Sequence, residues 1–159
     1  MAAALQPGDK APGFELPSDE GGDIRLADLK GKAVVLYFYP KDDTSGCTSE
    51  AKAFTEAQAD FDALGAIVVG VSKDSVKSHG KFRQKYGLSV RLGSDVEGEM
   101  IQRYGVWVEK SMYGRKYMGI ERATFLIDGA GVIRKVWRKV SVTGHAQEVL
   151  AATRELSAK

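Results

Sequence analysis

Three short runs of β-branched and aromatic residues constrain the fold of this chain more than any other feature of its sequence. They are AVVLYFY (33–39), AIVVGVS (66–72) and RATFLID (122–128). Continuous runs of this kind, without the polar alternation of a half-solvated strand, are typical of strands buried on both faces of a sheet.

Segments with helical periodicity lie between and after these runs. Within the first of them, apolar residues recur at helical spacing with polar residues between them, at Ala51, Phe54, Phe61 and Leu64. Ser and Asp favour helix starts, and Gly favours helix ends. Four helices are therefore expected: over Cys47–Leu64, from a cap at Asp74 or Ser75 to Tyr86 with Gly87 at its end, near 98–104, and over Gly144–Leu156.

The last third of the chain adds an antiparallel strand pair. The turn 129–131 (Gly-Ala-Gly) leads from the third run directly into VIRKVWRKV (132–140), whereas helices connect the earlier strands and imply parallel pairing. A short strand near 90–92 and a small hairpin around Gly21-Gly22 are also expected. The order β-α-β-α followed by β-β-α is that of the thioredoxin fold. This is an α/β fold with a mixed central β-sheet covered by helices on both faces.

A doubly wound nucleotide-binding sheet is the alternative fold. It is disfavoured because no G-x-G-x-x-G turn follows the first run and no G-x-x-x-x-G-K-[ST] segment occurs anywhere in the chain. The length of 159 residues suits one domain, so we expect a single domain over 1–159.

Charge and hydropathy exclude several kinds of partner. The chain has 23 basic and 21 acidic residues, a net charge of +2, which is too balanced for nucleic acid or an anionic membrane to be the main partner. The cluster of basic residues at 134–139 is better explained as a solvated strand face. No apolar stretch is long enough to span a membrane, and the first residues do not form a secretory signal. The single cysteine fits a reducing compartment, so we expect a cytoplasmic protein.

That cysteine, Cys47, stands in the segment of the sequence that indicates chemistry most clearly. Pro40 ends the first buried run, turn-forming residues follow it, and Cys47 falls in the first turn of the next helix. The unpaired N–H groups and the dipole at a helix start favour the thiolate, which is the nucleophilic form of cysteine. Thr44 is placed to cap this helix or to hydrogen-bond the sulfur. A buried structural cysteine is the plainer alternative, but the surrounding Pro, Thr and Gly favour a reactive one.

A fixed cation would hold a thiolate more firmly than a helix start alone. Arg122 is the best candidate, because a guanidinium at the head of a buried strand needs a partner. The alternative is a surface arginine at a strand end, or one paired with Glu121 or Asp128. His79 and His145 are too few to indicate a metal site and are expected to be surface or capping residues. We expect no metal and no cofactor.

The motif P-x-x-x-T-x-x-C, present as Pro40, Thr44 and Cys47, resembles that of the peroxiredoxins. The similarity runs from about Pro7 to the last helix and is greatest to the bacterioferritin comigratory protein (PrxQ) subfamily. The matching segments are YFYPKDDTSGCTSEAKAF (37–54), KYGL (85–88), YGVW (104–107), MYGRKYMGIERATFLID (112–128) and IRKVWRKV (133–140).

The resemblance implies a thiol-dependent peroxidase that reduces hydrogen peroxide and organic hydroperoxides. Cys47 would be the peroxidatic cysteine, which attacks the O–O bond and becomes a sulfenic acid. Thr44 and Arg122 would bind the peroxide oxygens, Pro40 would shield the sulfenic acid, and Glu50 would steady Arg122. A monomer or weak dimer is implied.

The chain departs from the subfamily at one position. Many members have a second, resolving cysteine five residues after the first, where this chain has Lys52 and no other cysteine. The sulfenic acid must therefore be reduced by an external thiol such as thioredoxin, glutaredoxin or glutathione. The alternative is a redox-sensing or binding module of thioredoxin-like fold that reacts without turnover.

Overall fold

A mixed five-stranded sheet forms the centre of the computed structural model, which describes residues 4–158. The strand order is β5-β4-β3-β8-β9. β3 pairs in parallel with β4, and β4 with β5, whereas β8 is antiparallel to both β3 and β9. The expected runs and their pairing directions are confirmed, with bounds β3 (Val34–Phe38), β4 (Ile67–Ser72), β5 (Arg91–Ser94), β8 (Ala123–Ile127) and β9 (Ile133–Trp137).

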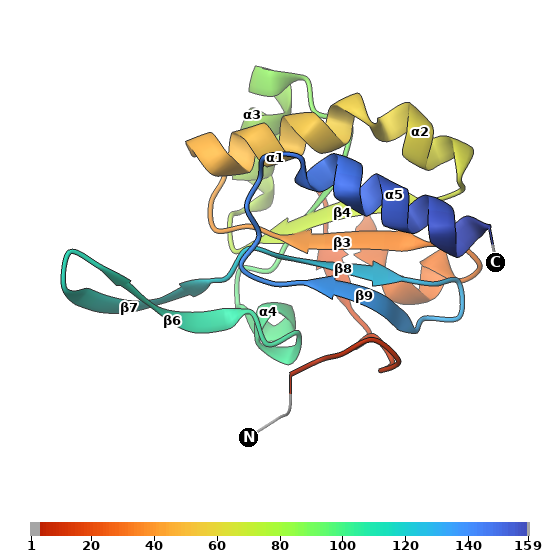
Figure 1. Cartoon of the computed structure of the whole chain (residues 1–159). Helices are drawn as coiled ribbons and strands as arrows, with labels where there is room; N and C mark the ends of the chain where they lie inside the picture. Colours follow the sequence, from red (N-terminus) through yellow and green to blue (C-terminus); the bar gives the residue numbers. More distant parts are fainter. Residues whose placement is uncertain (1–3, 159) are drawn as a thin grey trace.

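Helices cover both faces of this sheet, as expected for the thioredoxin-like α/β class. One face carries α1 (Ser45–Glu56), α2 (Gln58–Ala63), α3 (Val76–Tyr86) and α5 (His145–Ser157) (Figure 1). The other face carries α4 (Glu99–Arg103), the 3₁₀ helix η1 (Leu26–Leu29) and the hairpin of β1 (Glu15–Pro17) and β2 (Asp23–Arg25). Because consecutive residues of β3 point to opposite faces, Tyr37 packs into the core under α1 while Leu36 and Phe38 pack into the core over α4. No helix among residues 4–158 is both long enough and apolar enough to cross a membrane.

The helix expected over Cys47–Leu64 differs in detail. It begins two residues earlier, at Ser45, and it is interrupted at Ala57, whose backbone (φ −88°, ψ 1°) separates α1 from α2. The two helices still bury one apolar face, since the rings of Phe54 and Phe61 lie 6.1 Å apart in the same core. Of the two residues expected to cap α3, Asp74 and Ser75, the structure has Ser75 as the N-cap. Its side chain accepts a hydrogen bond from the Ser78 N–H.

A second hairpin, β6 (Trp107–Met112) and β7 (Arg115–Ile120), was not expected from the sequence. Its turn is Tyr113-Gly114, and both residues have positive φ (53° and 78°), as the tight turns that match strand twist require. The strands are mostly exposed, so they lack the apolar run that indicates a buried strand. Figure 1 shows this hairpin projecting beyond the sheet at the end where α1 begins.

Candidate active site

Cys47 lies where the chain passes from the central strand β3 into α1. It is the third residue of the helix, and Thr44 occupies the N-cap position with extended backbone (φ −98°, ψ 158°). The Thr44 carbonyl accepts the first helical hydrogen bond, from the Thr48 N–H at 2.8 Å. The thiol is therefore within the first turn, as predicted, but only 1% of Cys47 is exposed.

The cation predicted from the sequence reaches this sulfur. Phe38, the last residue of β3, pairs with Ala123, so Arg122 lies beside the point where the chain leaves β3 for the helix. Its Nη2 donates a hydrogen bond to Cys47 Sγ at 3.4 Å, and its Nη1 donates to Glu50 Oε1 at 2.7 Å. One planar guanidinium thus joins Cys47 and Glu50, which lie three residues apart on one side of α1.

The alternative partners considered for Arg122 are taken by other arginines. Glu121 pairs with Arg138 at 2.9 Å, and Asp128 pairs with Arg134 at 2.6 Å. Within residues 4–158, the hydrogen bond to the sulfur comes from this guanidinium rather than from the backbone amides expected at the helix start.

Gly46 is part of the site although the sequence did not single it out. A Cβ at this position would lie 3.0 Å from Arg122 Nη2, tighter than ordinary van der Waals contact. Since Gly46 precedes Cys47, a side chain here would press on the guanidinium that holds the sulfur. The contribution of Gly46 to the site comes from its packing against Arg122, which is far away in the sequence.

Thr44 does not make either of the contacts expected for its side chain. Its hydroxyl donates to the Lys41 carbonyl at 2.8 Å and neither caps α1 nor hydrogen-bonds the sulfur. The carbonyl three residues earlier is a closer acceptor because the loop turns back on itself, a common competitor for Thr side chains. Pro40 is partly buried and directly follows Tyr39, at the start of this loop.

Burial dominates the electrostatics of the carboxylate in the site. Only 1% of Glu50 is exposed, and burial raises its pKa to about 7, although the ion pair with Arg122 opposes that rise. Its second oxygen, Oε2, has no hydrogen-bond partner among the described residues, and neither has the buried Tyr37 hydroxyl. Burial also raises the pKa of Tyr37, and the neighbouring Glu50 carboxylate raises it further.

A Glu50→Gln variant is expected to lose a pH dependence of stability that the parent has. A carboxyl whose pKa is higher in the folded state binds its proton more tightly there, so its contribution is full below about pH 4.5 and is lost as pH rises through about 7. The free energy of unfolding of the parent should fall by as much as about 3 kcal/mol across this window. Urea denaturation at pH 5 and pH 7.5 measures it.

The exposed Glu56 on the same helix provides the matched control for this comparison, as Glu56→Gln. The control should keep the parent's pH dependence, and Glu50→Gln should flatten it. Equal slopes in Glu50→Gln and the parent would show that the carboxyl stays ionised across the window.

The loop between β3 and α1 is fastened to α3 by its two aspartates. Asp42 is buried and accepts hydrogen bonds from the Tyr39 hydroxyl and the Ser78 hydroxyl at 2.7 and 2.8 Å. The same carboxylate lies 2.7 Å from His79 Nδ1. Asp43 has a positive φ of 59° and is held by Lys85 at 2.8 Å and by the Tyr86 hydroxyl. This network fixes the backbone that carries Thr44.

The expectation that both histidines lie at the surface or serve as caps is wrong. His79 is fully buried, with its second ring nitrogen 3.1 Å from the Gly93 carbonyl. His145 is 4% exposed, and its Nε2 lies 2.8 Å from Thr124 Oγ1. Neither burial could be read from the sequence, because the polar partners are contributed by other elements. No cluster of three or more metal-ligating side chains occurs within the part of the chain that the structure describes.

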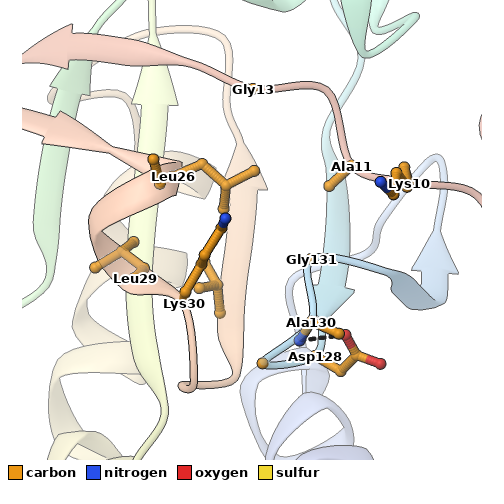
Figure 2. A pocket seen from close by; sticks show the side chains of 12 residues that line it. Lys10, Ala11, Gly13, Leu26, Leu29, Lys30, Asp128, Ala130 and Gly131 are labelled. Atoms are coloured by element: carbon orange, nitrogen blue, oxygen red, sulfur yellow. Dashed lines mark hydrogen bonds between the residues drawn. The ribbon is translucent and has the colours of Figure 1, made fainter.

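A cavity of about 260 Å³ lies elsewhere, at the opposite end of β3 from Cys47. Leu26 and Leu29 line it on one side and the 129–131 turn on another (Figure 2), and its other lining residues include Val34, Lys10 and Lys30. It has no residue in common with the site around the sulfur.

A buried thiol at a helix start, hydrogen-bonded by a guanidinium at the end of a central thioredoxin-like strand, defines the class of cysteine-dependent peroxidases. The chain belongs to the AhpC/TSA family, which its residues 7–136 match, and within that family to the Bcp or PrxQ peroxiredoxins.

Three comparisons support this assignment. The chain is 54% identical over 147 residues to a Bcp protein of Coxiella burnetii, covering 92% of this chain and 97% of the relative. It is 46% identical over 155 residues to peroxiredoxin Bcp of Bacillus subtilis, covering 98% and 99%. The structure of a Xylella fastidiosa PrxQ C47S mutant superposes with a TM-score of 0.92 at 37% identity, covering 98% of this chain and 99% of that one.

A structure of the Xanthomonas campestris bacterioferritin comigratory protein is also similar, with a TM-score of 0.86 at 42% identity. It covers 91% of this chain and 92% of that one. That protein was described in terms of its alkyl peroxide reduction activity. The fold and the peroxidase class predicted from the sequence are therefore confirmed.

Proposed function

We propose that this peroxiredoxin reduces hydrogen peroxide and organic hydroperoxides at Cys47 and is returned to its thiol form by an external thiol. The observation that carries the proposal is the hydrogen bond from Arg122 to Cys47 Sγ at 3.4 Å, in a site from which bulk water is largely excluded. A guanidinium in contact with the sulfur stabilises the negative charge that develops in the reaction on the leaving oxygen of the hydroperoxide. The alkyl peroxide activity of the Xanthomonas relative supports organic hydroperoxides as substrates.

In the first half of the cycle, the Cys47 thiolate attacks one oxygen of the hydroperoxide. An S–O bond forms as the O–O bond breaks, and the leaving oxygen takes up a proton and departs as an alcohol or as water. Cys47 is left as a sulfenic acid. Arg122 stabilises the departing oxygen, and Glu50 holds Arg122 in place through the 2.7 Å ion pair.

The residues of the loop have the remaining roles. The Thr44 hydroxyl already donates to Lys41, and its oxygen keeps lone pairs that accept a hydrogen bond from the hydroperoxide O–H. Pro40 shields the sulfenic acid from water at the start of the loop. Together with Cys47 and Arg122, these side chains make up the proposed substrate site.

In the second half of the cycle, an external thiol attacks the sulfenic sulfur, releases water and leaves a mixed disulfide. A second thiol breaks that disulfide and restores Cys47. The external thiol is required because Cys47 is the only cysteine and the usual resolving position is Lys52. Thioredoxin, glutaredoxin and glutathione are the proposed donors.

The proposal also covers location, assembly, domain organisation and nucleic-acid binding. We place the protein in the cytoplasm, where thiols stay reduced, as a monomer or weak dimer. We propose one domain over 1–159, supported by the single central sheet with a core on each face. The balanced charge of +2 argues against nucleic acid as a partner.

Counting turnovers separates a peroxidase from a redox sensor. With excess dithiothreitol, the purified chain is expected to consume many equivalents of hydrogen peroxide or cumene hydroperoxide. Without thiol it should consume about one equivalent and yield a sulfenic acid at Cys47, detected by a dimedone adduct in mass spectrometry. Consumption that stops at one equivalent in the presence of excess thiol would favour the sensor.

A further inference from the structure

The projecting hairpin β6–β7 has two faces of different composition. Directly paired residues of antiparallel strands share a face, and alternate residues point to opposite faces. The register Lys110↔Tyr117 and Met112↔Arg115 therefore defines one face, and Glu109↔Met118 and Ser111↔Lys116 define the other. We call the first the thiol-side face, for the reason given next.

The packing at the base of the hairpin orients these two faces. Trp107 and Ile120 belong to the second face and pack in the core on the α4 side of the sheet. The first face must then turn toward the other side of the sheet, where α1 and Cys47 lie. The chain also runs from Ile120 through Glu121 directly into Arg122.

The position of Lys110 supports this orientation independently. Its side chain passes over Gly119, where a Cβ would lie 3.2 Å from Lys110 Cδ. Burial lowers the pKa of Lys110, and the positive charge of Arg122 lowers it further. The Lys110 ammonium group is therefore close enough to the Arg122 guanidinium, which hydrogen-bonds the sulfur, to be affected by its charge.

The thiol-side face combines cations with exposed apolar side chains. Lys110 and Arg115 contribute positive charge, and Met112 and Tyr117 are 56% and 43% exposed. The acidic residue of the hairpin, Glu109, lies on the other face. Exposed Met and Tyr side chains flanked by charge are typical of protein interaction surfaces.

We propose that the thiol-side face of β6–β7 is the docking surface for the protein that donates the reducing thiol, a partner with acidic and apolar side chains around its cysteine. This inference rests on the proposed function, in which an external thiol is obligatory. The strands are roughly 20 Å long, more than a tripeptide thiol covers, and the two cations complement an acidic surface.

A second copy of the chain fits this face less well. A two-fold contact would bring the same surface from both copies together and so gather the Lys110 and Arg115 cations of both copies in one interface. Like charges facing each other across an interface oppose association. An acidic donor avoids this repulsion.

Two double variants with the same change in charge test the proposal. Arg115→Glu/Tyr117→Ser alters the thiol-side face, and Lys116→Glu/Met118→Ser alters the other face of the same hairpin. Peroxide turnover is measured with an acidic thioredoxin kept reduced by its reductase, with a reduced glutaredoxin, and with dithiothreitol. The first variant is expected to lose about tenfold in kcat/KM for the thiol protein that serves the parent, the second less than about twofold, and neither should change with dithiothreitol.

Several results would overturn the docking proposal. The proposal fails if both variants lose kcat/KM for the thiol protein equally, if neither loses it, or if the loss extends to dithiothreitol. It also fails if the oligomeric state changes only in Arg115→Glu/Tyr117→Ser. A parent that turns over with dithiothreitol but with neither thiol protein would overturn it as well. If the parent failed to turn over with every one of these thiols, dithiothreitol included, the proposed peroxidase function itself would be refuted. The two failures are therefore distinguishable.

Discussion

A Cys47→Ser variant is expected to lose peroxide turnover to the background rate, a fall of about four orders of magnitude or more. The serine hydroxyl stays protonated near neutral pH, and its oxygen is a far weaker nucleophile toward a peroxide than a thiolate sulfur is. No second cysteine is available to replace Cys47. Stopped-flow or coupled measurements of peroxide consumption with excess dithiothreitol give the rate.

The loss should be chemical rather than structural. Serine is close to cysteine in size, and its oxygen can accept the hydrogen bond that Arg122 Nη2 donates to the sulfur. The free energy of unfolding is therefore expected to change by no more than about 1–2 kcal/mol. A variant that consumed peroxide at the parent's rate would refute the assignment of Cys47 as the reactive group.

Moving the thiol provides the matched control. In Cys47→Ser/Ser49→Cys the chain still has one cysteine on α1, but at an exposed position that faces away from the buried side of the helix. Such a thiol should react with peroxide no faster than a free thiol in solution. Full recovery of turnover would mean that the guanidinium and the helix start contribute nothing to the reaction.

The parts of the site that could be predicted share a local signal. Cys47 follows a buried strand, a proline and a turn, which predict a helix start; Glu50, three residues further on, was expected only from the resemblance to the peroxiredoxins. Arg122 stands at the head of an apolar strand, where a charge needs a partner. The buried strands also have a local signal, because continuous runs of β-branched residues are typical of strands buried on both faces.

The parts that could not be predicted depend on contacts between distant segments. The burial of His79 follows from Asp42, 37 residues away, and the importance of Gly46 follows from the path of the Arg122 side chain. The Thr44 hydroxyl was expected to cap the helix or to hydrogen-bond the sulfur, but the loop turns so that it donates to the Lys41 carbonyl instead. The β6–β7 hairpin buries too little apolar surface to leave a periodic pattern, although its Tyr-Gly turn was a signal that could have been used.

An Arg122→Met variant is expected to lower kcat/KM for hydroperoxide by about 10²–10³-fold, the effect of removing one donor that stabilises developing charge in a water-poor site. The methionine side chain fills a similar volume but donates no hydrogen bond to Cys47 or Glu50. Steady-state kinetics with hydrogen peroxide and cumene hydroperoxide, at saturating dithiothreitol, measures the loss. Unchanged kinetics would exclude Arg122 from the substrate site.

The same substitution should also destabilise the fold, because it leaves the Glu50 carboxylate buried without a cation. Removing one partner of a buried pair typically costs about 3–5 kcal/mol, and the partly exposed guanidinium places this case toward the lower value. Since a neutral amide needs no cation, Arg122→Met/Glu50→Gln should recover much of the stability above pH 7 without recovering activity. The double variant thus separates the structural part of the effect from the chemical part.

Arg122→Lys shows whether charge alone is sufficient. A lysine keeps the positive charge but cannot donate in parallel to Cys47 Sγ and Glu50 Oε1 through one planar group. Its activity should therefore fall between those of the parent and Arg122→Met, with stability nearer the parent's. If Lys and Met variants were equally inactive, the bidentate geometry would be the essential property; if Lys matched the parent, the charge alone would explain the role of this residue.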